Sequence, residues 1–264
     1  LKELHFHCDL KREDTIFYFT TCGWMMWNWL VSALSIGSTV VLYDGSPFYP
    51  DGREMWKLAE ELKFTVFGTS AKYIDTCREN SIFPSTFSKL PKLRSILSTG
   101  SPLIEESFKY VYKHIKKNVH LASISGGTDI ISCFALGSPT LEVVKGELQC
   151  RGLGMDVHSY DENGKPIIEK KGELVCISAF PSMPVYFWND RDGLKYKNAY
   201  FSTFPGIWHH GDFIRISKKG SIKIYGRSDS TLNPGGVRIG TSEIYRVVNS
   251  INIIEDSLVI GQEW

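Results

Sequence analysis

The sequence is poor in the features that mark several common classes of protein. Its six cysteines are widely scattered among 264 residues and form no Cys-x-x-Cys pair, which argues against a zinc site of clustered ligands and against a disulfide framework. Reduced, mostly buried thiols are expected instead, as in a cytosolic protein. The most apolar run, residues 24–36, falls short of the roughly 20 residues that a membrane-spanning helix needs.

An excess of charge of either sign is also missing. The formal net charge is +1, so no electrostatic field favours nucleic acid or an anionic membrane as a partner. Residues 1–5 contain no apolar stretch of the kind found in signal peptides, and no repeats or low-complexity tracts occur. With 42% hydrophobic and 22% charged residues, the composition is that of an ordinary globular protein that can bury a substantial core.

The first half of the chain, residues 1–140, alternates strand-like and helix-like segments. Helices are expected between the strands, and Asp51 followed by Glu54 resembles the N-terminal capping box of one of them. This alternation predicts a mainly parallel sheet covered by helices, which binds ligands outside the carboxyl ends of its strands. The expected strands are residues 15–21, 40–43, 65–68, 93–97 and 119–124.

From about residue 141 the pattern changes to short strands separated by polar turns, which predicts an antiparallel, barrel-like subdomain over residues 141–228. Residues 229–264 read as a glycine-rich hinge followed by the beginning of a small C-terminal domain, with a helix from Thr241 and a strand at residues 257–260.

One hairpin of the second half has a chemical consequence. Counting outward from its turn at Lys219 pairs Asp212 near Gly226, so Asp212 and Arg227 are expected at the same open end. A carboxylate and a guanidinium delivered together suit one ligand, since the first accepts from hydroxyl groups while the second binds phosphate. A simple cross-strand salt bridge is the alternative.

Two small-residue loops follow predicted strands of the parallel sheet. They are Thr99-Gly100-Ser101 and the run from Ser125 through Gly126 and Gly127 to Thr128 and Asp129. Glycines at such places allow close approach of a ligand to the backbone, and a hydroxyl with a carboxylate can supply oxygen ligands to Mg²⁺. Either loop is alternatively a plain chain-reversal turn.

These segments together resemble the core motifs of the adenylate-forming superfamily, in order and in approximate spacing. Further runs are similar to the acetoacetyl-CoA synthetases within that superfamily, and the similarity extends to about Asp256. The resemblance implies an α/β fold of the ANL type: a large domain with a mainly parallel sheet and an antiparallel barrel-like part, and the start of a small α+β domain. The runs that carry the resemblance are residues 20–29, 97–103, 123–133, 187–190, 206–212, 225–229 and 232–240.

The resemblance also implies a reaction in two steps. A carboxylic acid, acetoacetate, is activated by ATP in the presence of Mg²⁺ to an acyl-adenylate with release of pyrophosphate, and the thiol of CoA then displaces AMP. Small molecules are the expected partners, and cytosolic use of acetoacetate for lipid synthesis is the implied setting. His209 and His210 are interpreted as orienting or packing residues.

Roles follow residue by residue from the matching motifs. Nucleotide contacts are expected from Gly100, Ser101, Pro102, Ser123, Ile124, Ser125, Gly126, Gly127, Thr128, Asp212, Arg227 and Arg238; catalytic roles from Thr128, Asp129 and Arg238, with Asp129 also facing the metal; an acyl pocket from Thr21, Cys22, Thr99 and Gly126; CoA contacts from Gly235 and Gly236; and a hinge at Asp229.

Two expected deviations concern substrate and completeness. Acetate-specific relatives carry a large aromatic residue at the position of Gly126, so its glycine is expected to leave room for a longer acid. The superfamily's phosphate loop and its acyl-phosphate lysine have no match within residues 1–264, so the chain alone is expected to be inactive. A synthetase for another short or medium acyl acid, and a truncated nucleotide-binding module, remain the alternatives.

Overall fold

The computed structural model describes residues 1–228, 231–232, 239–248, 250–251 and 253–260. The chain divides into two compact units. The first comprises Leu1–Met155 and Phe180–Pro184, and the second comprises Asp156–Ala179 and Val185–Trp264. In the described part of the chain, no helix has the length and apolar character needed to cross a membrane.

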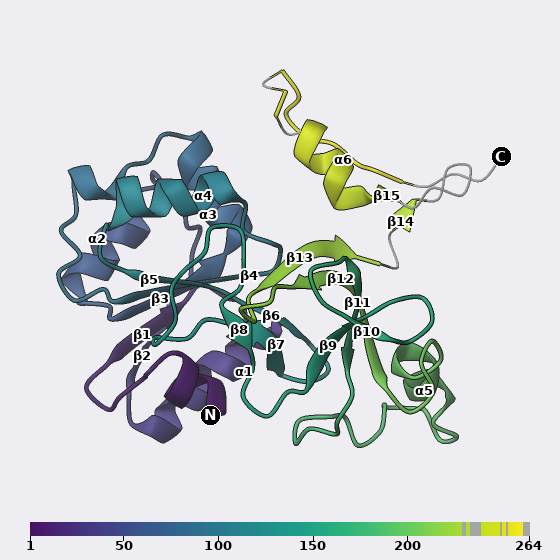
Figure 1. Cartoon of the computed structure of the whole chain (residues 1–264). Helices are drawn as coiled ribbons and strands as arrows, with labels where there is room; N and C mark the ends of the chain where they lie inside the picture. Colours follow the sequence, from purple (N-terminus) through teal and green to yellow (C-terminus); the bar gives the residue numbers. More distant parts are fainter. Residues whose placement is uncertain (229–230, 233–238, 249, 252, 261–264) are drawn as a thin grey trace. The chain divides into compact units, whose positions relative to one another are not determined.

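The first unit is built on a five-stranded parallel sheet with the order β2-β1-β3-β4-β5. Helices cover both faces: Figure 1 shows α2, α3 and α4 on one side and α1 on the other. The strands are β1 (Thr15–Tyr18), β2 (Thr39–Val41), β3 (Val66–Ser70), β4 (Ser95–Thr99) and β5 (His120–Ser123), and the helices are α1 (Met25–Val31), α2 (Glu54–Glu61), α3 (Ala71–Glu79) and α4 (Glu105–Tyr110). All five predicted strands are confirmed.

Two hydrophobic clusters explain why both faces are covered. Side chains alternate along a strand, so Phe17 and Phe67 point to the cluster under α2, α3 and α4, while Ile16 and Tyr18 point to the cluster under α1. Trp56 of α2 stacks on Phe67 with ring centroids 4.6 Å apart. The sheet is therefore fixed between two apolar layers, and only its strand ends and edges remain for chemistry.

The helices α2 and α3 begin differently. Ser70 caps α3 by accepting a hydrogen bond from the Tyr73 amide. The prediction of a capping box at Asp51 is wrong. Its carboxylate accepts from the backbone and side chain of Arg53 instead, and α2 begins at Glu54 without a side-chain cap. An Asx-type turn competes with capping because the carboxylate reaches an amide two residues on.

The remaining elements of the first unit are shorter. A three-stranded antiparallel sheet follows β5 directly, in the order β6-β7-β8. Its strands are β6 (Ser125–Gly127), β7 (Ser132–Leu136) and β8 (Cys150–Arg151), and single turns of other helix types occur at η1 (Glu3–His7), η2 (Ser32–Ile36), η3 (Pro84–Thr86) and η4 (Val111–Ile115).

The second unit contains a five-stranded antiparallel sheet with the order β10-β9-β11-β12-β13. Its elements are β9 (Val157–Tyr160), β10 (Pro166–Ile167), β11 (Gly172–Cys176), α5 (Leu194–Tyr200), β12 (Trp208–Ile216) and β13 (Ile222–Arg227), followed by the pair β14 (Thr231–Leu232) and β15 (Ile239–Gly240) and by α6 (Thr241–Val248). The predicted fold class, parallel and antiparallel sheets with helices, is confirmed.

The strand expected at residues 257–260 is not formed. The amide of Val259 donates to the hydroxyl of Tyr245 at 2.9 Å, so it contributes to no ladder. A strand needs a hydrogen-bonded neighbour as well as an apolar sequence, and the apolar sequence alone misled the prediction.

A partly buried ion pair in the first unit is expected to make its stability sensitive to acid. Arg94 Nη2 lies 2.7 Å from Asp14 Oδ2, and the guanidinium also donates to the carbonyls of Cys8 and Asp9 at 2.8 Å. Burial raises the pKa of the Asp14 carboxyl, but the hydrogen bonds from Arg94 and from the Lys11 amide together outweigh burial, so the pKa is lower than usual.

Because the folded pKa of Asp14 is depressed, its stabilising contribution is present above the unfolded pKa of about 3.9 and disappears as the pH falls through the folded value. We expect the free energy of unfolding to decline below about pH 4, and Asp14→Asn to flatten this decline. Urea unfolding at a series of pH values measures both slopes. Equal slopes in the two proteins would show that Asp14 does not contribute. Glu3, whose pKa is also lowered, leaves a residual slope in the variant.

Candidate functional site

The two glycine loops of the first unit lie side by side at the carboxyl edge of the parallel sheet. Thr99, the last residue of β4, donates its hydroxyl to the carbonyl of Ile124 at 2.8 Å, and the Ile124 amide donates to the Ser98 carbonyl at 2.8 Å. Neighbouring parallel strands end at one edge, so their loops meet there. The structure thus brings together the predicted residues that follow β4 with those that follow β5.

Gly100 occupies a backbone conformation that favours glycine, with φ of +91°. A Cβ placed there would be 3.8 Å from the Trp24 ring and 3.9 Å from Ser70 Cβ. Gly100 therefore borders the segments after β1 and β3 as well. Ser101 and Pro102 continue this loop and are exposed.

Thr21 and Cys22 follow β1 and are exposed close to this edge. Cys22 is the exposed member of six free cysteines, of which Cys8, Cys77, Cys133 and Cys176 are buried. Burial raises the pKa of the Cys8 thiol to about 12, which keeps it protonated and unreactive. The predicted picture of free and mostly buried thiols is confirmed.

Thr128 and Asp129 lie in the turn between β6 and β7, and both are exposed. Within the described ranges, no three His, Cys, Asp or Glu side chains gather in a way that could hold a metal ion. A single accessible carboxylate beside a hydroxyl nevertheless fits Mg²⁺, which is commonly held by one or two carboxylates together with substrate phosphates. The metal assignment to Asp129 stays a prediction.

The space expected at Gly126 is not there. A Cβ built on Gly126 would lie 2.0 Å from the Ser132 carbonyl oxygen and 2.9 Å from Cys133 Cα, both backbone atoms of the paired strand β7. The glycine is required for the two strands to approach each other, so the interpretation that its missing side chain opens an acyl pocket is wrong for this backbone. Whether Gly126 contacts a ligand through its main chain stays a prediction.

The second unit presents Asp212 and Arg227 directly opposite each other on β12 and β13. The count from the turn had placed Gly226 there, but a bulge between Phe213 and Ile214 shifts the register by one residue. Arg227 Nη1 lies 3.6 Å from Asp212 Oδ1 and donates to the His210 carbonyl at 3.1 Å. The Asp212 side chain is 12% exposed and that of Arg227 is 48% exposed, so the cation faces solvent.

Gly211 allows Arg227 to lie against β12. Its φ is +78°, and an added Cβ would approach Arg227 Nη2 to 2.9 Å. The adjacent histidines point to different partners: His209 Nε2 lies 2.9 Å from Glu173 Oε2, whereas His210 Nε2 lies 3.6 Å from Asp212 Oδ2. The motif around Gly211 therefore gathers a carboxylate, an imidazole and a guanidinium at one end of a hairpin.

We expect Gly211→Ala to displace the Arg227 guanidinium and to weaken binding of a phosphate-bearing ligand about tenfold, the loss of one charge-assisted hydrogen bond. Gly206→Ala is a matched control, because Gly206 has the same φ of +78° but an added Cβ would meet nothing within 4 Å. Both variants bear the cost of a left-handed alanine. Isothermal titration with ATP compares them; equal affinities would show that the contact with Arg227 is unimportant.

The predicted residues fall into separate groups. Residues from Thr21 to Asp129 belong to the first unit, and Asp212 and Arg227 belong to the second. Asp229, Gly235, Gly236 and Arg238 lie outside the described residues.

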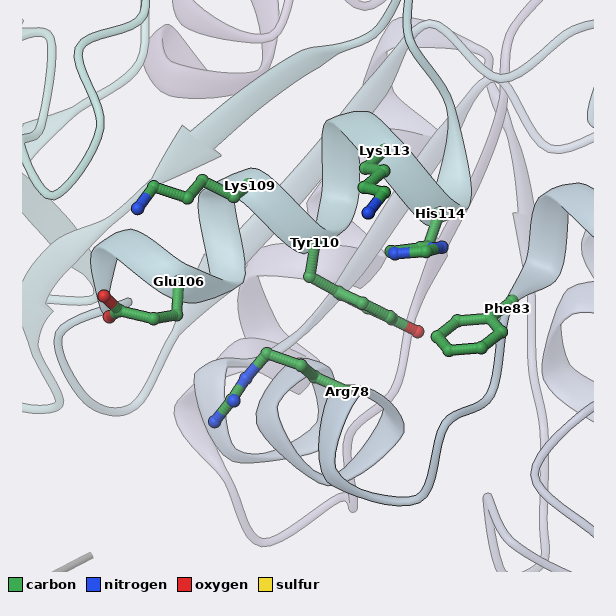
Figure 2. Close-up of a pocket in the computed structure, with 7 residues that line it drawn as sticks. All are labelled: Arg78, Phe83, Glu106, Lys109, Tyr110, Lys113 and His114. Carbon is green, nitrogen blue, oxygen red and sulfur yellow. The ribbon is translucent and has the colours of Figure 1, made fainter. Parts of the chain in front are cut away.

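A cavity of about 220 Å³ lies elsewhere in the first unit, between α3, α4 and η4. Figure 2 shows the Tyr110 ring extending between these helices toward Phe83, beside His114. Phe83 and His114 stack with centroids 4.3 Å apart. Its lining includes three cationic residues and one acid, so the charge around the cavity is mainly positive; the four are Arg78, Lys109, Lys113 and Glu106.

Comparisons with known proteins agree with this arrangement of motifs. The family model for AMP-binding enzymes matches residues 2–187. The acetoacetyl-coenzyme A synthetase of Rhizobium meliloti is 56% identical over 264 residues, which is 100% of this chain and 41% of that protein. The acetoacetyl-CoA synthetase of Gallus gallus is 52% identical over 99% of this chain and 39% of its own length.

Among solved structures, the acetoacetyl-CoA synthetase from Streptomyces lividans superposes with a TM-score of 0.93 at 47% identity, covering 100% of this chain and 41% of that one. The chain thus spans about two fifths of the length of the relatives that it matches.

Proposed function

Because this chain belongs to the family of AMP-binding enzymes, we propose that the protein carrying it ligates acetoacetate to CoA through an acetoacetyl-adenylate. One observation carries the proposal: identity of 46–56% to proteins named acetoacetyl-CoA synthetase extends over nearly the whole chain, not over isolated motifs. The geometry of the two glycine loops and of the β12–β13 hairpin supports it.

The first half-reaction joins acetoacetate to the nucleotide. A carboxylate oxygen of acetoacetate attacks the α-phosphorus of ATP, the bond to the bridging oxygen breaks, and pyrophosphate leaves. No covalent bond to the protein is needed, so the protein contributes positioning and stabilisation of charge. The adjoining loops after β4 and β5 offer backbone and hydroxyl groups for the nucleotide, and Asp212 offers its carboxylate to the ribose hydroxyls.

Mg²⁺ would neutralise charge on the phosphates, and Thr128 and Asp129 would hold it together with phosphate oxygens. Their exposure in the β6–β7 turn suits this role. Arg227, with its cationic group toward solvent, supports a phosphate contact.

The second half-reaction transfers the acyl group. The sulfur of CoA attacks the acyl carbon of the adenylate, its proton is lost to solvent, and AMP leaves with the electron pair of the broken C–O bond. Gly235, Gly236, Arg238 and the hinge at Asp229 remain proposals for this step. Thr21, Cys22 and Thr99 remain proposals for the acyl pocket, since they border the same sheet edge as Gly100.

The test is acetoacetate-dependent exchange of labelled pyrophosphate into ATP by the complete gene product that carries these residues. Acetate, butyrate and buffer alone serve as comparison substrates. Exchange fastest with acetoacetate is expected; faster exchange with another short acid would reassign the substrate, and ATP binding without exchange with any acid would indicate a nucleotide-binding module.

A further inference from the structure

Three side chains follow one another along β12. Trp208, His210 and Asp212 occupy every second position of β12, all three are buried, and contacts between successive side chains join them. The indole Nε1 of Trp208 donates to His210 Nδ1 at 3.5 Å, and His210 Nε2 lies 3.6 Å from Asp212 Oδ2. A relay of two side chains therefore leads to the carboxylate.

The relay fixes which nitrogen of His210 carries a proton. An indole N–H can only donate, so Nδ1 of a neutral imidazole beside it must be the acceptor. The proton of neutral His210 then resides on Nε2, the nitrogen that faces Asp212. The histidine presents a donor to the carboxylate and not a lone pair.

Trp208 is itself held in place. Its ring stacks on Tyr200 of α5 with centroids 3.7 Å apart and an angle of 14° between planes, and its side chain is 1% exposed. An indole packed in this way cannot turn its N–H elsewhere without disrupting the cluster. The orientation of His210 is thereby determined by packing at the far end of the relay.

The two oxygens of Asp212 face different groups. Arg227 Nη1 lies beside Oδ1 and His210 Nε2 lies beside Oδ2, each at 3.6 Å. Both contacts are longer than a hydrogen bond, but partners on opposite oxygens favour one plane of the carboxylate more than a single partner would. Each oxygen can accept more than one hydrogen bond, so a ligand hydroxyl can still be accommodated.

We propose that His210, oriented by Trp208, is a positioning residue that holds the Asp212 carboxylate in the plane required to accept hydrogen bonds from the ribose of the nucleotide. This inference rests on the proposed function. It distinguishes His210 from its neighbour His209, which lies on the other face of β12 and pairs with Glu173. The sequence alone gives both histidines the same description.

The test compares substitutions at position 210 whose amide nitrogen replaces one or the other nitrogen of the imidazole. A glutamine at position 210 can place its NH₂ near the site of Nε2, whereas asparagine places it near Nδ1. We expect His210→Ala and His210→Asn to raise the KM for ATP about tenfold with little change in kcat, and His210→Gln to stay within about threefold of the native protein. His209→Gln, on the opposite face, should leave the KM for ATP unchanged.

A second measurement is independent of activity. ¹⁵N NMR of the imidazole in the complete gene product should show the Nε2–H tautomer of His210, and Trp208→Phe should allow the Nδ1–H form to appear. Equal recovery by glutamine and asparagine, or a predominant Nδ1–H form in the native protein, would overturn the proposal. If the native protein showed the Nε2–H form but bound no adenine nucleotide, the proposed function would fail and the role toward ribose with it.

Discussion

Replacing Asp212 by alanine is expected to slow adenylate formation about a hundredfold, and replacing Arg227 by alanine to have a similar effect, which is the size of one lost charge-stabilising contact in an active site. The expected cost in stability is small. Arg227 is half-exposed, and an ion pair of this kind contributes about 0–1 kcal/mol to folding. Pyrophosphate exchange measures the first quantity, and urea unfolding measures the second.

Arg215 provides the matched control. Arg215 lies on β12, the strand of Asp212. Its Nη1 is 3.6 Å from Glu169 Oε2, the same distance as in the Asp212–Arg227 pair. Arg215→Ala removes an arginine and an ion pair but no proposed ligand contact, so its exchange rate should match that of the native protein. If Asp212→Ala and Arg227→Ala lost exchange only in proportion to their melting temperatures, the pair would be the structural salt bridge that the sequence left open.

Gly126→Ala is expected to lower the free energy of unfolding by about 3 kcal/mol and to abolish nucleotide binding by the loop after β5. The added methyl would be placed 2.0 Å from the Ser132 carbonyl oxygen, and neither strand can yield without breaking the β6–β7 pairing. Tryptophan at this position would destabilise the fold further, so its effect on substrate choice could not be separated from its effect on folding. Differential scanning calorimetry and titration with ATP measure the two effects.

Gly23→Ala separates this steric effect from the general effect of removing a glycine. A Cβ at Gly23 has Thr21 Oγ1 at 3.8 Å as its nearest neighbour, an ordinary contact. The free energy of unfolding of the Gly23→Ala protein should differ from that of the native protein by less than about 1 kcal/mol. A Gly126→Ala protein as stable as Gly23→Ala would mean that β6 can move away from β7 at little cost.

The parallel sheet was predictable because its strands are short apolar runs that turn residues separate clearly. Gly68 and the residues around it read as a strand and form one. Elements that depend on contacts distant in the sequence were missed. The helix α5 carries no buried residue, so it lacks the apolar face that reveals a helix. The strand expected at residues 257–260 had the right composition but its Val259 amide binds a tyrosine hydroxyl.

At the candidate site, chain order located the loops but not their internal geometry. The location of Asp212 and Arg227 at one end of a hairpin followed from counting, yet the exact pair depended on a bulge that no residue type announces. The sequence also showed that Gly126 is small, but not that its side-chain direction is filled by a paired strand. The register of two paired strands and the direction in which a side chain points both depend on the neighbouring strand, so the sequence of one strand does not determine them.

The hydrogen bond from Thr99 to Ile124 has a mechanical consequence. It joins the two glycine loops laterally, so neither can swing outward alone without losing that bond. Opening should therefore be concerted, and the amides of the two loops should exchange with deuterium at similar rates. Thr99→Val, which keeps the shape but cannot donate, should weaken this coupling, although the backbone bond from the Ile124 amide to the Ser98 carbonyl remains. A nucleotide that contacts one loop should then protect the other loop less from exchange.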